Sequence, residues 1–177
     1  MSVYGGRELA SAFRTVRKNT IQVAEDIPEA KYDFVAANGC KSVARMLKHI
    51  AIVTWFWDEV HGKRLTTMVG MDFAAMSKRA EAEEAKPRSK AEIVELLRSE
   101  GEKFASWLET LKPEFLAEMV TQPDGTTKSR FESLLGAKEH EMHHRGQLML
   151  IERQLGIVPH LTRQREERIA QMQAAKA

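Results

Sequence analysis

Apolar residues recur every three to four positions in four long stretches of this chain, the period of a helix with one buried face. The first stretch runs from about Arg7 to Asp26 and stops before Pro28. The second begins at Ser42, a residue type that favours helix N-termini, and runs to about Val60, before Gly62. The apolar face of the first stretch carries Leu9, Phe13, Val16, Thr20 and Val23.

The third and fourth stretches each open with a capping box, in which a serine and a glutamate three residues later bond each other's backbone N–H groups. One starts at Ser89-Lys-Ala-Glu92 and continues to Leu111, where Pro113 prevents extension. The other starts at Ser129-Arg-Phe-Glu132 and ends at Gly156, a residue type that commonly terminates helices. Four such helices predict an all-α protein built as a four-helix bundle.

A long connection separates the second and third predicted helices. This segment, from Lys63 to Arg88, contains Met68, Met71, Phe73 and Met76, which predict a short helix ahead of a charged run. The bundle is therefore expected to have one long crossover between helices 2 and 3.

Two smaller features complete the expected fold. The segment from Glu118 to Lys128, with Pro-Asp-Gly at 123–125, allows at most a small turn or hairpin. The charged tail from Thr162 to Ala177 predicts a short, solvated C-terminal helix. At 177 residues the chain is expected to form a single domain over residues 1–177.

Composition excludes several classes of function. The net charge of +2 gives no strong field, so we expect no nucleic-acid partner. The longest apolar run, Ile50 to Trp57, is too short to span a bilayer, and the first residues lack the apolar core of a secretory signal. Cys40 is the single cysteine, which fits a reducing compartment. We therefore expect a cytoplasmic protein without a membrane partner.

Three histidines are candidate metal ligands. His140 and His144 lie four residues apart on the fourth predicted helix, so both imidazoles project from one face. His49 shares the apolar face of the second helix and is expected to point toward them. Three imidazoles suit a divalent ion with open positions for a substrate. Zn²⁺ and Ni²⁺ are favoured, with Fe²⁺, Mn²⁺ or Cu²⁺ as alternatives.

The same region matches the H-E-x-x-H pattern of zinc peptidases, in which Glu141 is the general base. The extended form of that motif requires glycine and histidine where this chain has Gln147 and Leu150. A helical wheel places Glu141 off the histidine direction, nearer the rim of the site. Glu141 thus remains only a candidate catalytic residue, and a peptidase remains the weaker alternative.

The other histidines have less direct claims. His143 lies on the shoulder of the histidine face, where a surface or supporting role is expected. His61 at a helix end and His160 in a loop after Pro159 are both expected to be solvated, with His160 the nearer of the two to the site.

Several motifs make the chain similar to the DinB-like family, which includes the YfiT-type metal-dependent proteins. They are Ile27-Pro28-Glu29 with Tyr32-Asp33-Phe34, Ser42-Val43 leading to His49-Ile50-Ala51, and His140-Glu-Met-His-His-Arg-Gly-Gln-Leu148. The resemblance implies a four-helix bundle, a three-histidine metal site at His49, His140 and His144, and a homodimer. It also implies transfer or isomerisation chemistry that depends on small thiols.

Two hypotheses of function follow. The first is a metal-dependent transferase that joins a small-molecule thiol to an electrophile. The second is a metal-binding stress or interaction protein without turnover. An apolar cavity open to the metal would favour the enzyme, whereas a site closed by a fourth protein ligand would favour a structural role.

Overall fold

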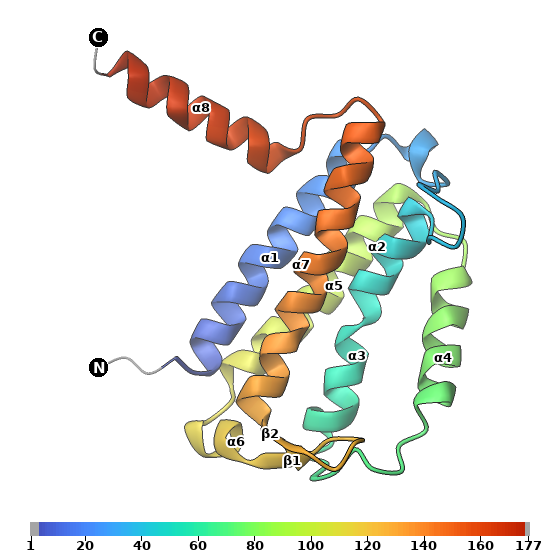
Figure 1. The fold of residues 1–177 in the computed structure, drawn as a ribbon, viewed down its shortest axis with the longest axis vertical. Helices are drawn as coiled ribbons and strands as arrows, with labels where there is room; N and C mark the ends of the chain where they lie inside the picture. The colour runs from blue at the N-terminus through green and yellow to red at the C-terminus, as the bar shows by residue number, and fades with distance from the viewer. Residues whose placement is uncertain (1–3, 176–177) are drawn as a thin grey trace.

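The computed structural model describes residues 4–175. Four long helical stretches run side by side as a four-helix bundle (Figure 1), which confirms the predicted fold class. They are α1 (Gly6–Asp26), α2 (Val43–Ile52) continued by α3 (Thr54–Trp57) and the π-helical turn η2 (Asp58–Gly62), α5 (Lys90–Glu109) and α7 (Arg130–Gln154). The shorter elements are η1 (Glu29–Lys31), α4 (Phe73–Ala85), α6 (Pro113–Ala117), β1 (Met119–Thr121), β2 (Thr127–Ser129) and α8 (His160–Ala174).

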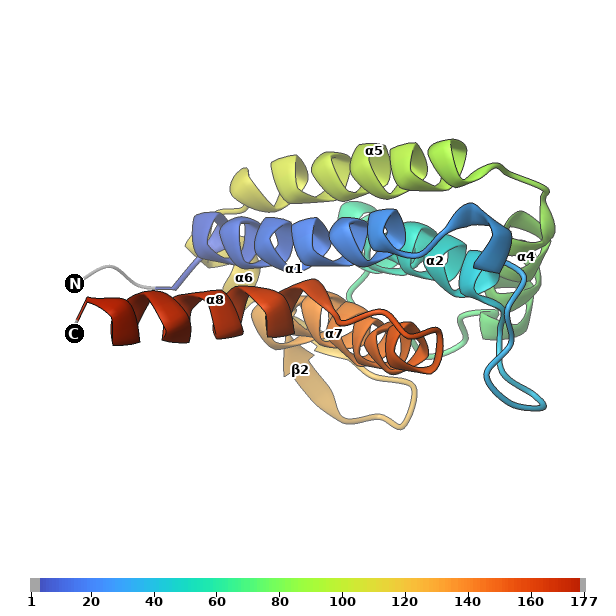
Figure 2. The same cartoon turned by 90° about the horizontal axis from the view of Figure 1, so that it is seen from above.

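The long crossover between the second and third bundle helices contains α4. Two perpendicular views place α4 beside α2, outside the four long helices (Figures 1 and 2). The antiparallel hairpin of β1 and β2 lies at the end of the bundle where α7 begins (Figure 1). The crossover and the small hairpin both agree with the prediction.

Local chemistry sets the helix boundaries. Ser89 and Ser129 both form complete capping boxes, with Glu92 and Glu132 as the returning side chains. Gly156 follows α7 with a φ of +77°, a left-handed conformation that glycine adopts without strain. The fourth helix was therefore predicted with nearly correct ends, and the third was predicted two residues too long.

The second bundle helix is less regular than predicted. The α-helical pattern is interrupted between Ile52 and Thr54 and ends in the π-helical turn. Thr54 Oγ1 donates to the carbonyl oxygen of Ala51 at 3.5 Å, a side-chain bond of the kind that competes with the backbone ladder and bends helices. The apolar periodicity does not report such a bond.

Two apolar clusters form the main core, and Arg17 connects them. One cluster includes Ile50 and Leu97, whose carbonyl oxygens accept hydrogen bonds from the Arg17 guanidinium at 3.1 and 2.7 Å. The other cluster includes Phe13, whose ring centroid lies 5.2 Å from Cζ of Arg17. A buried cation therefore lies where the two clusters meet.

The last helix, α8, projects away from the bundle (Figure 1), and nearly all of its side chains are at least partly exposed. This agrees with the predicted solvated C-terminal helix. The last two residues of the predicted segment, 176–177, lie outside the described residues. Within residues 4–175, no helix combines the length and apolar character needed to cross a membrane.

Candidate metal centre

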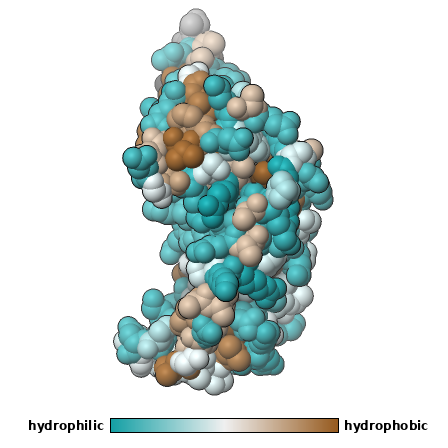
Figure 3. All heavy atoms as spheres, turned by 90° about the vertical axis from the view of Figure 1, so that its right-hand side faces the viewer, coloured by the Kyte–Doolittle hydropathy of each residue, from teal (hydrophilic) through white to brown (hydrophobic). Residues whose placement is uncertain are grey.

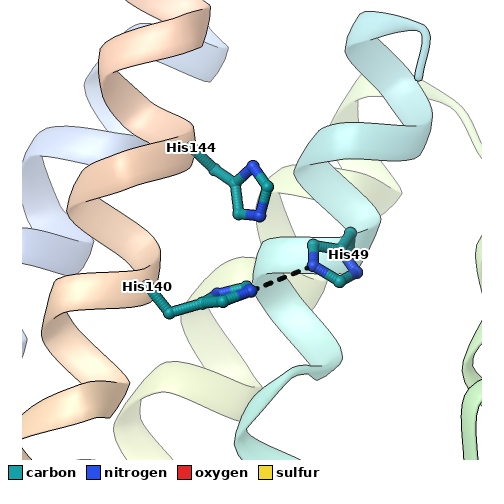
Figure 4. A group of neighbouring side chains, drawn as sticks. All are labelled: His49, His140 and His144. Carbon is teal, nitrogen blue, oxygen red and sulfur yellow. Dashed lines mark hydrogen bonds between the residues drawn. The ribbon is translucent and has the colours of Figure 1, made fainter. Parts of the chain in front are cut away.

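Three histidines from two helices come together in the bundle. His49 on α2 faces His140 and His144 on α7, and one nitrogen from each lies within 4.8 Å of the others. Figure 4 shows the three rings turned toward a common point. The Nε2 atoms of His49 and His140 lie 3.2 Å apart, and all three side chains are half-buried.

The backbone of α7 places its two histidines at the edge of the buried face. Counted at about 100° per residue from His140, the buried side chains of α7 lie at roughly 20 to 120°, centred close to Glu141. His140 at about 0° and His144 at about 40° lie at one margin of this range, so they point toward the core less directly than predicted. The shift leaves the imidazoles half-exposed beside the core, where an ion or substrate can reach them.

Glu84 on α4 supports His49. Its side chain is 1% exposed, and its Oε1 accepts a hydrogen bond from Nδ1 of His49 at 2.7 Å. Lys41 donates to the other carboxylate oxygen at 2.5 Å. A carboxylate that holds one ring nitrogen of histidine fixes the tautomer and leaves Nε2 free to bind a metal.

Glu84 is not among the site residues predicted from the sequence. The residue lies in the charged run of the crossover, where alternating glutamates and alanines suggest a solvated surface. Its burial depends on how α4 docks against α2, which local sequence does not reveal.

The two histidines of α7 differ in their supporting bonds. Nδ1 of His144 lies 2.8 Å from Oε1 of Gln147, which leaves its Nε2 free. Nδ1 of His140 is buried and finds no hydrogen-bond partner within residues 4–175. The site thus has one carboxylate support, one amide support and one histidine nitrogen without support.

The surroundings keep His140 and His144 neutral. Burial lowers the pKa of His140 to about 4, and the neighbouring His144, His49 and His143 add to this shift. Burial also lowers the pKa of His144, against a smaller raising effect of Gln147. Neutral imidazole is the form that binds a metal ion, so both side chains are ready to act as ligands near pH 7.

The donor geometry fits a divalent ion. Two nitrogens bound to one ion at about 2.0–2.1 Å can lie no more than about 4.2 Å apart. The observed limit of 4.8 Å is slightly larger, so small side-chain rotations would bring the three donors into range. Three nitrogen ligands leave further coordination positions free, the arrangement typical of catalytic sites.

An apolar cavity of about 440 Å³ opens beside the histidines. His49, His140 and Glu84 line one part of it. The remaining wall comes mainly from the α2–α3 stretch and from α4, with Ile52, Val53, Trp55, Phe56, Trp57, Phe73, Met76 and Ala80. The volume lies within the range of small-molecule sites. Among the described residues, the histidine cluster has three donors and no fourth donor that would close the site.

Glu141 does not lie at the rim of this site. Its side chain is fully buried and forms an ion pair with Arg17, with Nη2 and Oε2 3.0 Å apart. Nε of the same guanidinium donates to both carboxylate oxygens at 3.0 and 3.1 Å. The expected rim position was wrong because α7 turns Glu141 toward α1. A carboxylate held in this way is poorly placed to remove a proton from water in the cavity.

The expectations for the remaining histidines need correction. His61 is buried, not solvated; its Nε2 lies 2.9 Å from Ser133 Oγ, and burial lowers its pKa to about 4. His160 is also buried, starts α8 and lies 3.3 Å from Oδ1 of Asn19, outside the histidine cluster. His143 is exposed and contacts Gln147 at 3.2 Å, in agreement with a surface or supporting role.

The chain is similar in sequence to a known family and in fold to several solved structures. The sequence model of the DinB family matches residues 1–174. YfiT from Bacillus subtilis, described as a probable metal-dependent hydrolase with an unusual four-helix bundle topology, is similar with a TM-score of 0.69 at 14% identity, over 89% of this chain and 91% of that one.

Two further solved structures are similar. The DinB-like protein YjoA from Bacillus subtilis gives a TM-score of 0.63 at 23% identity, over 84% of this chain and 92% of that one. A mycothiol-dependent maleylpyruvate isomerase gives 0.63 at 12% identity, over 84% of this chain and 63% of that one. No curated protein matches the sequence significantly. At these identities the structural likeness shows the fold alone.

Proposed function

The chain belongs to the DinB family, and we propose that it is a metal-dependent enzyme that transfers a small thiol to an electrophile. The observation that carries this proposal is the position of three imidazole donors beside an apolar cavity. Similarity to a probable metal-dependent hydrolase and to a mycothiol-dependent isomerase supports metal chemistry and a thiol partner, respectively.

His49, His140 and His144 would hold the ion, and Glu84 would orient His49. When bound, a divalent ion supplies a Lewis acid that lowers the pKa of a thiol and so provides a thiolate near neutral pH. The apolar cavity wall would hold the electrophile next to the histidines and exclude water. The ligand set favours Zn²⁺ or Ni²⁺ without selecting between them.

The proposed transfer balances without a protein base. The thiol proton passes to solvent, the sulfur forms a bond to an electrophilic carbon, and the displaced group leaves with the electron pair of the broken bond. An ordinary thiol has a pKa of about 8.5, so it needs only modest activation. A peptidase needs a base for water, and Glu141 is already held by Arg17. Thiol transfer is therefore preferred over peptide hydrolysis.

The first test is metal content. His49→Ala, His140→Ala and His144→Ala should each lose most bound metal in protein purified without an affinity tag, as measured by plasma mass spectrometry. His143→Ala is the matched control, because it removes an exposed histidine from the same helix. Equal metal content in all four variants would refute the three-histidine site.

The second test is the reaction. Metal-loaded protein should accelerate conjugation of a small thiol to an uncharged electrophile, and His144→Ala should remove this acceleration. A screen that finds peptide cleavage without any thiol-dependent reaction would overturn the proposed reaction class. A protein that binds metal but turns over neither kind of substrate would favour the non-catalytic alternative.

A further inference from the structure

Aromatic rings on the cavity wall form a series that reaches the histidines. The rings of Phe73 and Phe56 have centroids 6.4 Å apart with an angle of 31° between their planes. Phe56 packs edge-on against Trp57 at 5.3 Å, and Trp57 in turn lies 6.4 Å from the ring of His140. A flat apolar molecule in this cavity would therefore contact aromatic rings from α4 to the candidate ligands.

The polar atoms of the two cavity tryptophans are already used. Trp57 donates its indole N–H to the carbonyl oxygen of Ser133 at 3.0 Å. Trp55 donates its indole N–H to Oε2 of Glu100 at 2.8 Å. Because neither donor is free, these residues offer a ligand only the apolar parts of their rings.

The charged groups on the cavity wall are unsuited to an anion. Three carboxylates, from Glu59, Glu81 and Glu84, face two cations, Lys41 and Arg79. The Lys41 ammonium lies 2.5 Å from Glu84 and is thereby neutralised. Away from an ion bound at the histidines, an anionic ligand would have to approach these carboxylates with little compensation from the cavity wall.

Arg79 is the remaining cation, and it lies at the outer edge of the cavity. The residue is exposed, and its guanidinium carbon lies 5.1 Å from the centroid of the Trp55 ring. A guanidinium in contact with water is screened. It therefore covers Trp55 without making the interior of the cavity attractive to anions.

Helix α4 contributes its two large apolar side chains, Phe73 and Met76, and also Ala80 to the cavity wall. Met76 and Ala80 line it and are only half-exposed, whereas most other residues of α4 are exposed. Figure 3 looks onto this side of the molecule, where the surface is mostly hydrophilic with apolar side chains in small groups. A methionine beside the aromatic wall suits an aromatic ligand, because sulfur and aromatic rings attract each other.

The aromatic rings lie together in a cavity whose indole N–H groups already have hydrogen-bond partners and whose lysine is paired with a glutamate. From this juxtaposition we propose that the cavity binds an uncharged aromatic compound, with its reacting end toward the histidines. The volume of about 440 Å³ lies toward the lower end of the usual range for ligand sites, which suits a small ring system. This inference rests on the proposed function only in naming the bound compound as the electrophile.

The binding test uses two fluorescent probes that share a ring system and differ in charge. N-phenylnaphthylamine is neutral, and anilinonaphthalene sulfonate is its sulfonated, anionic analogue. In fluorescence titrations of the metal-loaded full chain, the neutral probe should bind at least about ten-fold more tightly. Equal affinity, or tighter binding of the sulfonate, would overturn the inference.

A matched pair of variants locates the bound probe. Met76→Glu introduces a carboxylate into the cavity and should weaken binding of the neutral probe at least about ten-fold, because burial of an unpaired charge is costly. Met172→Glu makes the same change on exposed α8 and should leave affinity unchanged. Equal effects of the two substitutions would show that the probe binds elsewhere.

Phe73→Ser guards against misfolding of the first variant, since Phe73 is 37% exposed at the start of α4. This substitution should also weaken binding of the neutral probe and leave metal content unchanged. Probe binding without thiol transfer would refute the proposed reaction and leave the ligand class intact. Thiol transfer with charged electrophiles only, and without neutral-probe binding, would refute the ligand class alone.

Discussion

Glu141 illustrates how the partner of a buried carboxylate determines its role. The H-E-x-x-H pattern predicts that Glu141 is a catalytic base. In the fold, it forms an ion pair with Arg17 between two apolar clusters. Arg17 also donates to the carbonyl oxygens of Leu97 and Ile50, so the guanidinium has its hydrogen bonds satisfied. This carboxylate is therefore a structural group of the core.

We predict that Glu141→Gln lowers the free energy of unfolding by roughly 3 kcal/mol, because it leaves the Arg17 cation buried without a counter-charge. Metal content should stay unchanged. Urea denaturation followed by circular dichroism would measure the loss. Glu139→Gln, an exposed change on the same helix, should have little effect. A variant of unchanged stability that loses peptide cleavage would restore the peptidase interpretation.

Glu152 is a buried carboxylate with no such partner. Its side chain is fully buried, and neither oxygen has a hydrogen-bond partner within residues 4–175. Burial raises its pKa to about 7, with a smaller contribution from Asp26, and the cations of Arg163 and Arg153 oppose this shift. In the unfolded chain the same group ionises near its ordinary value of 4.5.

The sign of the resulting pH dependence follows. Between about pH 4.5 and 7 the unfolded chain loses this proton while the folded protein keeps it, so stability falls as pH rises. We predict that Glu152→Gln is more stable than the parent at pH 8, by on the order of 2–3 kcal/mol, and that the difference disappears toward pH 4. Denaturation across this range would measure it, with exposed Glu166→Gln as control. A difference independent of pH would contradict this prediction.

At the scale of the element, α4 is attached to the bundle in an unusual way. Glu84 is its single buried residue, and this residue bonds to His49 and Lys41. Lys48 adds a hydrogen bond to the carbonyl oxygen of Lys86, just after the helix, at 2.7 Å. The helix that covers the cavity is thus held near its C-terminal end by the same carboxylate that supports a candidate metal ligand.

We predict that Glu84→Gln lowers metal affinity about ten-fold, the usual effect of losing a carboxylate behind a ligating histidine. Amide hydrogen exchange in α4 should become faster in the same variant, because its buried anchor is weakened. Calorimetry and mass-detected exchange would measure the two effects. Glu83→Gln is the control, since Glu83 pairs with Lys86 and Arg88. Equal effects of both substitutions would contradict the proposed role of Glu84 in both metal binding and the anchoring of α4.

Elements whose ends carry local chemistry are predictable from the sequence. The capping boxes at Ser89 and Ser129 correctly predicted where α5 and α7 begin, because the bonds that define them lie within three residues. Burial that depends on packing between distant segments is not predictable in this way. Glu84 and His61 are polar residues in polar surroundings along the chain, and only their tertiary contacts bury them.

At the scale of the whole molecule, the spacing of His140 and His144 and the face of His49 were enough to predict which side chains would meet. The cavity could not be predicted, because its wall joins the α2–α3 stretch to α4 across the crossover. A crossover has no sequence period that determines where it folds back. The meeting of the three candidate ligands could thus be predicted from local sequence, and the shape of the cavity could not.

Oligomeric state remains a prediction at this scale. We expect a homodimer, and the large apolar side chains left exposed on α7 and α8 include Leu150 at 60% and Met172 at 57%. Light scattering at micromolar concentrations should give twice the chain mass of 20.1 kDa. Leu150→Lys should shift the population toward monomer if the α7 surface forms the interface. A parent protein that is monomeric throughout this range would contradict the expectation.

The crossover also bears on how proteins of this design can diverge. All three candidate ligands lie on α2 and α7, whereas Phe73, Met76 and Ala80 of the cavity wall lie on α4. Mutations in α4 can therefore change which molecules the cavity admits while the three candidate ligands stay unchanged. Glu84 is the exception, because its carboxylate accepts the hydrogen bond from His49 and its loss is predicted to weaken metal binding. Under the proposed function, substrate specificity can therefore change through the side chains of this one helix, as long as Glu84 is kept.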